Sequence, residues 1–293
     1  MRIFVTGASG WIGSAVVPEL IGAGHQVLGL ARSDAAAQAV AGLGAEVLRG
    51  DLSDTDVLRT GALDSDGVIH LAFVVPSVTE AATRTDAAAI EIFTESLAGS
   101  GKPLVISGAT LVRPGRPATE RDELVAAGPI AARITNMQAA LAATGRGVRS
   151  GLVMLPRSVH GEGERHGFIP QLIALARAEG VSGYLGDGAS RWPAVHVKDA
   201  ASLYRLAIEQ GPPGAVLNAV GDEGVPVREI AEVIGRHLNL PARSRPAAEY
   251  QGMLAHLLGT DMPASSTITQ ELMGWKPTHP GLIEDIEQGH YFR

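Results

Sequence analysis

Short apolar runs alternate with longer segments of helical spacing along the first half of the chain. The first run covers residues 3–5, and apolar positions at Ala15, Val16 and Leu20 then recur on one face of a helix. Further strands are predicted at residues 25–31, 47–52, 67–73, 103–110 and 148–155, with helices at 35–41, 87–97 and 130–144. This alternation, with right-handed crossovers, predicts an α/β fold with a doubly wound Rossmann-type parallel sheet.

The spacing changes in the second half, where the elements are mixed and shorter. Helices are predicted at residues 169–178, 200–209, 227–238 and 249–258, with short strands or turns near 183–187 and 215–219. Asp199 is expected to cap the second of these helices. The sequence therefore predicts a dinucleotide-binding domain at residues 1–158. Residues 159–293 are expected to form mainly a smaller α/β substrate lobe, interleaved with the first sheet.

Three glycines, Gly7, Gly10 and Gly13, lie between the first apolar run and the first helix. In a strand–turn–helix context this spacing predicts a turn that binds the pyrophosphate of a dinucleotide. Gly7 can adopt backbone angles that a side chain forbids. Gly10 lets the backbone approach the pyrophosphate, and Gly13 lets the helix pack closely on the strand. The alternative is a glycine-rich turn without a ligand.

The end of the second strand is where such a fold selects its cofactor. A carboxylate there accepts hydrogen bonds from the adenosine ribose, whereas an arginine pairs with a 2′-phosphate. Ala31 ends this strand, and Arg32 and Ser33 follow. Asp34 is expected to cap the next helix, although its carboxylate can instead serve as the ribose acceptor. These residues favour NADP(H) over NAD(H) as the cofactor.

Other strand ends carry further candidate residues. Asp51 can accept a hydrogen bond from the adenine amine, or it can be a turn residue or helix cap. Small Ala72 leaves room for the nicotinamide ribose. His70 lies within an apolar run and is predicted to be a hydrogen-bonded core histidine rather than a catalyst. Ser107 is predicted to polarise a substrate oxygen, because ligands bind outside the carboxyl ends of parallel strands; the alternative is a hydroxyl that satisfies a turn.

Composition and charge exclude several classes of protein. The chain has 293 residues, long enough for one large domain or two lobes, and it contains no cysteine. It therefore has no disulfide, thiolate metal site or cysteine nucleophile, and we predict no metal site. The net charge is −7 and no long basic stretch occurs, which argues against nucleic-acid binding.

No stretch of about twenty apolar residues is present, so no membrane span is predicted. A predicted core strand follows Met1 directly, which leaves no room for a signal peptide. We therefore expect a cytoplasmic protein. The loops expected at the cleft carry few charges other than Arg157, Arg165 and His160, so a small and fairly apolar substrate is expected.

The chain resembles the short-chain dehydrogenase/reductase superfamily, and most of all its extended branch of NAD-dependent epimerases and dehydratases. The resemblance covers nearly the whole chain and rests on seven motifs: Thr6-Gly7-x-x-Gly10-x-x-Gly13, Gly50-Asp51-Leu52, His70-Leu71-Ala72, Ile106-Ser107-Gly108, Pro156-x-x-Val159-His160-Gly161, His196-Val197-x-Asp199 and Leu272-x-Gly274-Trp275-x-Pro277. It implies a Rossmann lobe, a small substrate lobe and often a homodimer built on two helices per subunit.

The resemblance also implies which residues contact the cofactor: Gly7, Ser9, Gly10, Trp11, Ile12, Arg32, Asp51, Leu52, Leu71 and Ala72. We expect Gly13, Ser33, Phe73 and Pro156 at the same site. Ser107 would match the family's catalytic hydroxyl.

The chain departs from this family in its proton donor. The family uses a tyrosine followed four residues later by a lysine, on the helix after the serine strand. The helix predicted at residues 130–144 has neither; no lysine occurs between Lys102 and Lys198, and the first tyrosine is Tyr184. The absence of this pair argues against reactions that need a tyrosinate base, such as sugar epimerisation and alcohol oxidation. It fits the members of the superfamily that are called atypical. Tyr184, near a predicted substrate loop, is the one tyrosine that can stand in.

Two functions fit these observations. The first is an NADPH-dependent reductase of a small carbonyl, imine or activated alkene, in which cofactor chemistry is oriented by the protein. Its proton would come from water, or from Arg133, Thr135, Asn136 or His160 acting through water. The second is a non-catalytic NADP(H)-binding sensor or partner-binding protein, which the missing tyrosine and lysine support.

Overall fold

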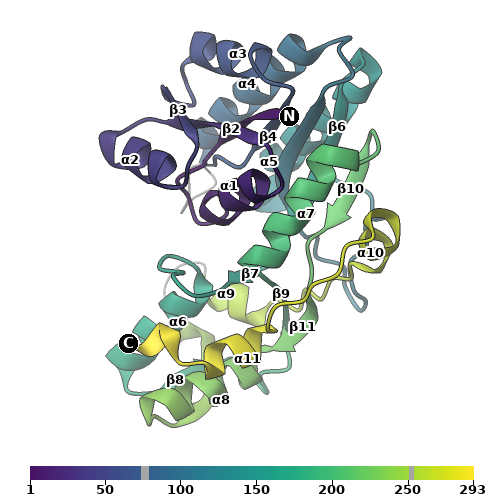
Figure 1. Cartoon of the computed structure of the whole chain (residues 1–293). Helices are drawn as coiled ribbons and strands as arrows, with labels where there is room; N and C mark the ends of the chain where they lie inside the picture. Colours follow the sequence, from purple (N-terminus) through teal and green to yellow (C-terminus); the bar gives the residue numbers. More distant parts are fainter. Residues whose placement is uncertain (74–78, 251–253) are drawn as a thin grey trace.

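A parallel sheet of seven strands forms the centre of the larger of two lobes (Figure 1). The computed structural model describes residues 1–73, 79–250 and 254–293. The strands are β1 Arg2–Thr6, β2 Gln26–Ala31, β3 Glu46–Arg49, β4 Gly67–His70, β5 Pro103–Ala109, β6 Arg149–Leu155 and β10 Ala215–Asn218. Their order across the sheet is β10-β6-β5-β4-β1-β2-β3. The order reverses between β1 and β4, which is the switch point where ligands bind in such sheets.

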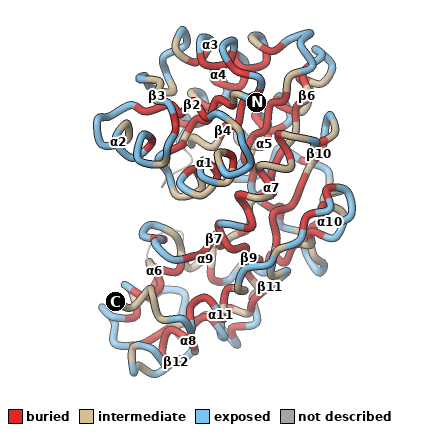
Figure 2. Tube along the Cα trace, viewed as in Figure 1, coloured by how far each residue is buried: buried red, intermediate tan, exposed pale blue. Residues whose placement is uncertain are grey.

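Helices cover both faces of this sheet. On one face lie α1 Gly13–Gly22, α2 Asp34–Gly42 and α7 Val197–Gln210, and on the other lie α3 Thr55–Leu63, α4 Glu80–Leu97 and α5 Ala131–Ala142. Because successive strand residues point to opposite faces, Ile3 and Val5 join one apolar core and Phe4 joins the other. Figure 2 shows the buried strands between the helices. The predicted doubly wound Rossmann fold is confirmed.

The smaller lobe has its own apolar core, which includes the fully buried Trp192. Its strands are β7 Ser158–His160, β8 Ser182–Tyr184, β9 Arg191–His196, β11 Asp222–Pro226 and β12 Ala242–Ser244, in the sheets β11-β9-β7 and β12-β8. Its helices are α6 Phe168–Glu179, α8 Val227–Leu238, α9 Leu254–Gly259 and α11 Leu282–Glu287. The remaining elements are α10 Thr267–Met273 and the short 3₁₀ turns Gly128–Ile130, Ala143–Arg146, Ala247–Glu249 and His290–Phe292.

The chain passes between the lobes more than once. After β9 it returns along α7, which packs against α1, and then adds β10 to the edge of the large sheet beside β6. Figure 1 shows α7 leading from the smaller lobe into the larger one. The larger lobe therefore includes residues from beyond position 158.

Two predicted helix caps are wrong. Helix α2 begins at Asp34, and its cap is Ser33, whose Oγ accepts a hydrogen bond from the N–H of Ala36 at 3.2 Å. The Asp34 carboxylate is bound instead by Arg49 Nη2 at 2.9 Å. Arg49, at the end of β3, therefore binds the carboxylate that was expected to cap the helix.

The second wrong cap is Asp199. Helix α7 begins two residues earlier, and His196 Nδ1 accepts a hydrogen bond from the N–H of Lys198 at 3.2 Å. Asp199 lies in the first turn, where its carboxylate binds the N–H groups of Thr278 and His279 at 3.0 Å each. Asp199 thus fastens the C-terminal segment to α7.

Two further predicted boundaries differ from the structure. Helix α4 begins at Glu80 rather than residue 87, because Thr79 Oγ1 accepts a hydrogen bond from the N–H of Ala82. Part of the helix predicted at residues 249–258 lies outside the described residues, and α9 covers Leu254–Gly259. The helix predicted at residues 227–238 is confirmed at both ends.

Candidate functional site

The glycine turn joins β1 to α1 at the switch point of the sheet. Gly7 has a φ of +71°, and a Cβ there would lie 2.8 Å from the backbone nitrogen of Ala72. A Cβ at Gly13 would lie 2.2 Å from the carbonyl oxygen of Gly7, whereas one at Gly10 would lie 3.2 Å from the same atom. Gly7 and Gly13 are therefore required by the protein's own backbone. Gly10 leaves room beside the turn.

The N-terminus of α1 is free to receive an anion. Its cap position, Ile12, makes no side-chain hydrogen bond to the helix, and the first turn contains no acidic residue. Helix N-termini with free N–H groups attract phosphate through those groups and the helix dipole. Trp11, beside the cap, donates through Nε1 to the carbonyl oxygen of Val159 at 2.7 Å, which ties the turn to the smaller lobe.

The end of β2 presents an exposed cation and a carboxylate that is bonded at one oxygen. Arg32 is exposed directly after Ala31, and Asp34 is engaged by Arg49. Asp51 accepts hydrogen bonds at one carboxylate oxygen from the N–H and the hydroxyl of Ser53. These bonds and the charge of Arg32 lower the pKa of Asp51. Asp51 thus stabilises the turn after β3 through one carboxylate oxygen.

The end of β4 lies against the end of β1. The N–H groups of Leu71 and Ala72 donate to the carbonyl oxygen and the Oγ1 of Thr6, respectively. His70 is buried, with ring nitrogens 2.7 Å from Thr6 Oγ1 and 3.1 Å from Asp86 Oδ1. The prediction of a core histidine is confirmed. Leu71 and Ala72 therefore border the glycine turn.

Ser107 is near the end of β5, but its side chain is already bound. Its Oγ lies 2.7 Å from the hydroxyl of Tyr204 and donates to the carbonyl oxygen of His70 at 3.3 Å. Tyr204 comes from α7 and is fully buried, and burial raises the pKa of its phenol. The hydroxyl of Ser107 therefore links β5 to α7. No local pattern indicates this pair, because its members are 97 residues apart.

Asn136 is part of a buried network between α5 and α4. Its Nδ2 donates to the carbonyl oxygen of Thr83 at 2.9 Å and to Asp86 Oδ2 at 2.7 Å. Burial alone would raise the pKa of Asp86, but hydrogen bonds from His70 and Asn136 and the charge of Arg133 lower it overall. Asn136 thus holds an ionised aspartate behind the site.

Arg133 has a guanidinium group that is only partly bonded. Nη2 donates to the carbonyl oxygen of Ser107 at 3.1 Å, and the group lies 3.8 Å over the ring of Phe73. Nη1 is buried and has no hydrogen-bond partner among the described residues. Burial lowers the pKa of this arginine, opposed by the charge of Asp86. Arg133 is therefore an available donor beside the ends of β4 and β5.

Thr110 is a further candidate residue that was not among those expected at the site. This residue follows β5 directly and is 4% exposed, and its hydroxyl has no partner among the described residues. Its N–H donates to the carbonyl oxygen of Leu155, so it lies beside the end of β6. An unbonded buried hydroxyl at the ligand-binding edge is a candidate to contact substrate. Its place just beyond a strand is the signal that could have found it.

His160 does not face the site, contrary to expectation. It is fully buried in β7, and its Nδ1 lies 2.9 Å from Asp285 Oδ2 of α11. Its ring packs edge-on against His196, whose pKa burial lowers to about 4. Pro156 is also buried, directly after β6. A segment 125 residues away covers this histidine, so the sequence pattern of a flexible loop was misleading.

Residues 3–219 match the NAD-dependent epimerase/dehydratase family. The chain belongs to this family. An uncharacterized protein of Saccharomyces cerevisiae is 44% identical over 99% of both chains. The 4-hydroxy-2-methyl-3-oxo-4-farnesyl-3,4-dihydroquinoline-1-oxide ketoreductase of Stigmatella aurantiaca is 30% identical over 74% of this chain and 67% of that protein. The crystal structure of a Thermus thermophilus UDP-glucose 4-epimerase with NAD superposes with a TM-score of 0.76 at 19% identity, over 99% of both chains.

Membership of the epimerase/dehydratase family and the reductase relatives support an oxidoreductase-type enzyme that binds an NAD(P) cofactor. Within residues 1–73, 79–250 and 254–293, no group of histidine and acidic side chains is arranged to hold a metal ion. None of the helices in these ranges has the length and hydropathy needed to cross a membrane.

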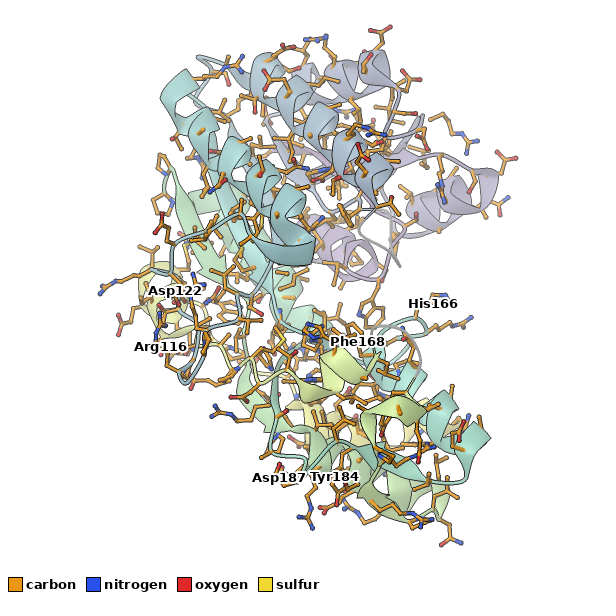
Figure 3. All side chains as sticks on the ribbon, turned by 180° about the vertical axis from the view of Figure 1, so that it is seen from behind. Arg116, Asp122, His166, Phe168, Tyr184 and Asp187 are labelled. Atoms are coloured by element: carbon orange, nitrogen blue, oxygen red, sulfur yellow. The ribbon has the colours of Figure 1, made fainter. Side chains whose placement is uncertain are left out.

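Helix α5 of this family member contains neither tyrosine nor lysine. Tyr184, the expected stand-in, lies at the far end of the smaller lobe from the large sheet, as Figure 3 shows. Its ring is 9% exposed and packs beneath Arg228. Tyr184 is therefore too distant to donate a proton at the edge of the large sheet.

Glu164 is a buried carboxyl near the glycine turn and makes stability depend on pH. It accepts a hydrogen bond from the hydroxyl of Tyr291 at 2.6 Å, and burial raises its pKa from 4.5 to about 7. Between these pH values the unfolded chain ionises at this position while the native chain stays protonated. Raising the pH from 4.5 to 7 should therefore lower the free energy of unfolding by up to about 3 kcal/mol from this group.

Urea unfolding of the parent and Glu164→Gln at pH 4.5 and pH 7.5 measures this effect. The variant should lack this part of the pH dependence. Glu162→Gln, at an exposed position in the same loop, should behave like the parent. Equal pH dependence in the parent and Glu164→Gln would contradict the assignment.

Proposed function

We propose that this chain is an NADPH-dependent reductase of a small substrate with a carbonyl, imine or activated alkene. The observation that carries the proposal is that the glycine turn and Arg133 share one edge of the sheet. Gly7 lies against Ala72, and the next residue, Phe73, lies beneath the guanidinium of Arg133. A dinucleotide bound along the turn would thus bring its reactive end to a buried donor.

When bound, the reduced nicotinamide would supply a hydride, and the protein supplies binding, orientation and electrostatics. Arg133 keeps its charge because arginine does not deprotonate in proteins. It therefore acts as a donor to the oxygen on which negative charge develops, and water supplies the proton. The free hydroxyl of Thr110 can donate a second hydrogen bond to the same oxygen.

The preference for NADPH is supported by the end of β2. Arg32 is exposed there, and the charge of Asp34 is partly offset by the bond from Arg49 to one of its oxygens. Replacing Arg32 by alanine should weaken NADPH binding by about 1.5–3 kcal/mol, the contribution of a charge-assisted hydrogen bond. NADH binding should change little. Fluorescence titration of both cofactors measures this, and tighter binding of NADH by the parent would contradict the preference.

Turnover tests the proposal directly. Purified protein with NADPH is incubated with a panel of aldehydes, diketones, imines and enones, and the nicotinamide absorbance is followed. Loss of absorbance that requires both protein and substrate supports a reductase. Tight NADPH binding without turnover of any class would favour the second function.

That second function is a non-catalytic NADP(H)-binding sensor. It is favoured by the composition of α5 and by the bound state of Ser107 and Asn136, which the reductase hypothesis had assigned to chemistry. Nη1 of Arg133 and the hydroxyl of Thr110 have no hydrogen-bond partner among the described residues, which favours the reductase, because a sensor would gain nothing from leaving them unbonded.

A further inference from the structure

Arg157 is a largely buried cation without a counter-ion. It follows β6 by two residues, at the carboxyl edge of the large sheet, and it is only partly exposed. No carboxylate of the described residues lies within 4.0 Å of its guanidinium. Residues 74–78 and 251–253, which lie outside the described ranges, include no aspartate or glutamate. The chain therefore offers no acidic partner to this arginine.

The contacts that Arg157 does make are with soft and aromatic groups. Its Nε and Nη2 point at the sulfur of Met262, at 3.1 and 2.7 Å. The guanidinium lies 5.4 Å from the ring of Phe168 and 5.8 Å from that of Trp192. A thioether is a weak acceptor, and aromatic faces compensate a desolvated cation by only about 2 kcal/mol.

The uncompensated charge is costly to the protein alone. Burial lowers the pKa of Arg157 to about 10, and no nearby charge opposes this shift. The group is still charged at neutral pH. Burying an ion without a partner costs several kcal/mol of folding free energy. An anion that pairs with Arg157 would recover part of this cost.

The fork of the guanidinium remains available for such an anion. Nε and Nη2 face Met262, but no described residue accepts a hydrogen bond from Nη1. The edge formed by Nη1 and Nη2 matches the two oxygens of a carboxylate or phosphate. Figure 3 shows Phe168 on the side of the smaller lobe that faces the larger lobe, and Arg157 lies against this ring.

We propose that Arg157 binds an acidic group of the substrate, so that the substrate is a carbonyl, imine or activated alkene carrying a carboxylate or phosphate. This inference rests on the proposed function and narrows its substrate class. It revises the expectation of a fairly apolar substrate. Met262, Phe168 and Trp192 pack around the guanidinium and limit the access of water to it.

The first test uses benzoate as the acid, benzamide as its neutral match, and inorganic phosphate. Each is titrated calorimetrically into the full chain, with and without saturating NADP⁺. Benzoate or phosphate should bind at least about 10-fold more tightly than benzamide, as expected for a charge-assisted hydrogen bond. Equal binding of all three probes to the parent would overturn the proposal. Binding of only one of the two anions identifies which acid the site takes.

Variants of Arg157 locate the anion. Arg157→Met keeps the length of the side chain, and it should weaken benzoate or phosphate binding by about 10- to 100-fold. Arg243→Met, at an exposed arginine of β12, should leave binding unchanged. Arg157→Lys keeps the charge but loses the forked guanidinium, so it should bind benzoate or phosphate with intermediate affinity. It replaces Arg157→Met in this test if that variant does not fold. An acid preference that survives in both Arg157 variants would overturn the proposal.

Separate NADPH titration distinguishes the possible failures. The cofactor also carries phosphates, so NADPH binding to Arg157→Met must equal that of the parent. A loss of more than about 10-fold would assign Arg157 to the cofactor and overturn the substrate proposal. If the parent protein binds no NADPH, the proposed function is refuted. The titration of benzoate and phosphate without NADP⁺ still measures acid binding in that case.

Discussion

Gly10→Val should lower the affinity for NADPH by at least about 10³-fold, while the protein stays folded. A Cβ at Gly10 would lie 3.2 Å from the carbonyl oxygen of Gly7, a close contact that a small shift relieves. The side chain would then occupy the space that the turn leaves for a pyrophosphate. Fluorescence titration with NADPH measures the loss, and thermal unfolding reports whether the fold is kept.

Two other glycines are matched controls for this result. Gly13→Val should not fold, because its Cβ would lie 2.2 Å from one backbone oxygen and 2.6 Å from another. Gly22→Ala should be neutral in both measurements, since a Cβ there meets no atom within 4 Å. Undiminished NADPH binding by folded Gly10→Val would mean that the turn is not the cofactor site.

Arg133→Met should lower kcat by about 10²–10³-fold, the cost of removing one preorganised donor to a developing oxyanion. NADPH binding should change little, because the predicted pyrophosphate site lies at the glycine turn. The effect belongs in kcat rather than in KM alone, since polarising the oxygen matters most when charge develops on it. Single-turnover hydride transfer measures this step without product release.

Ser107→Ala distinguishes this arrangement from the sequence-based hypothesis. If Ser107 polarises the substrate, its variant loses about 10²-fold in kcat. If its hydroxyl serves the bond to Tyr204, the variant loses about 1 kcal/mol of stability and keeps its rate. Thr110→Val should then be the slower enzyme. A slow Ser107→Ala beside unaffected Arg133 and Thr110 variants would restore the original assignment.

The fold was predictable because its signals are local. Residues 3–5 are apolar without interruption since both faces of β1 are covered, and the glycines mark a turn that the backbone cannot make otherwise. His70 was correctly assigned to the core for the same reason, as it lies within an apolar run.

The side-chain partners in the site were not predictable, because they come from distant parts of the chain. Ser107 meets Tyr204 of α7, which packs on that face of the sheet, and His160 is covered by Asp285. The residue pattern within a strand or loop does not indicate which distant residue packs against it in the folded protein. Arg157 is the opposite case. Its proposed role follows from the lack of an acidic partner among the described residues, and this lack can be seen only in the folded structure.

The return of the chain to the large sheet affects the order in which it can fold during synthesis. Residues 1–158 contain six of the seven strands but lack α7, which covers one face, and β10, which pairs with β6. Until α7 leaves the ribosome, the apolar face that later packs against Leu203, Tyr204 and Ala207 stays open to water. The nascent larger lobe therefore exposes apolar surface of the kind that promotes aggregation, and residues 159–196 of the smaller lobe are synthesised before the larger one can close.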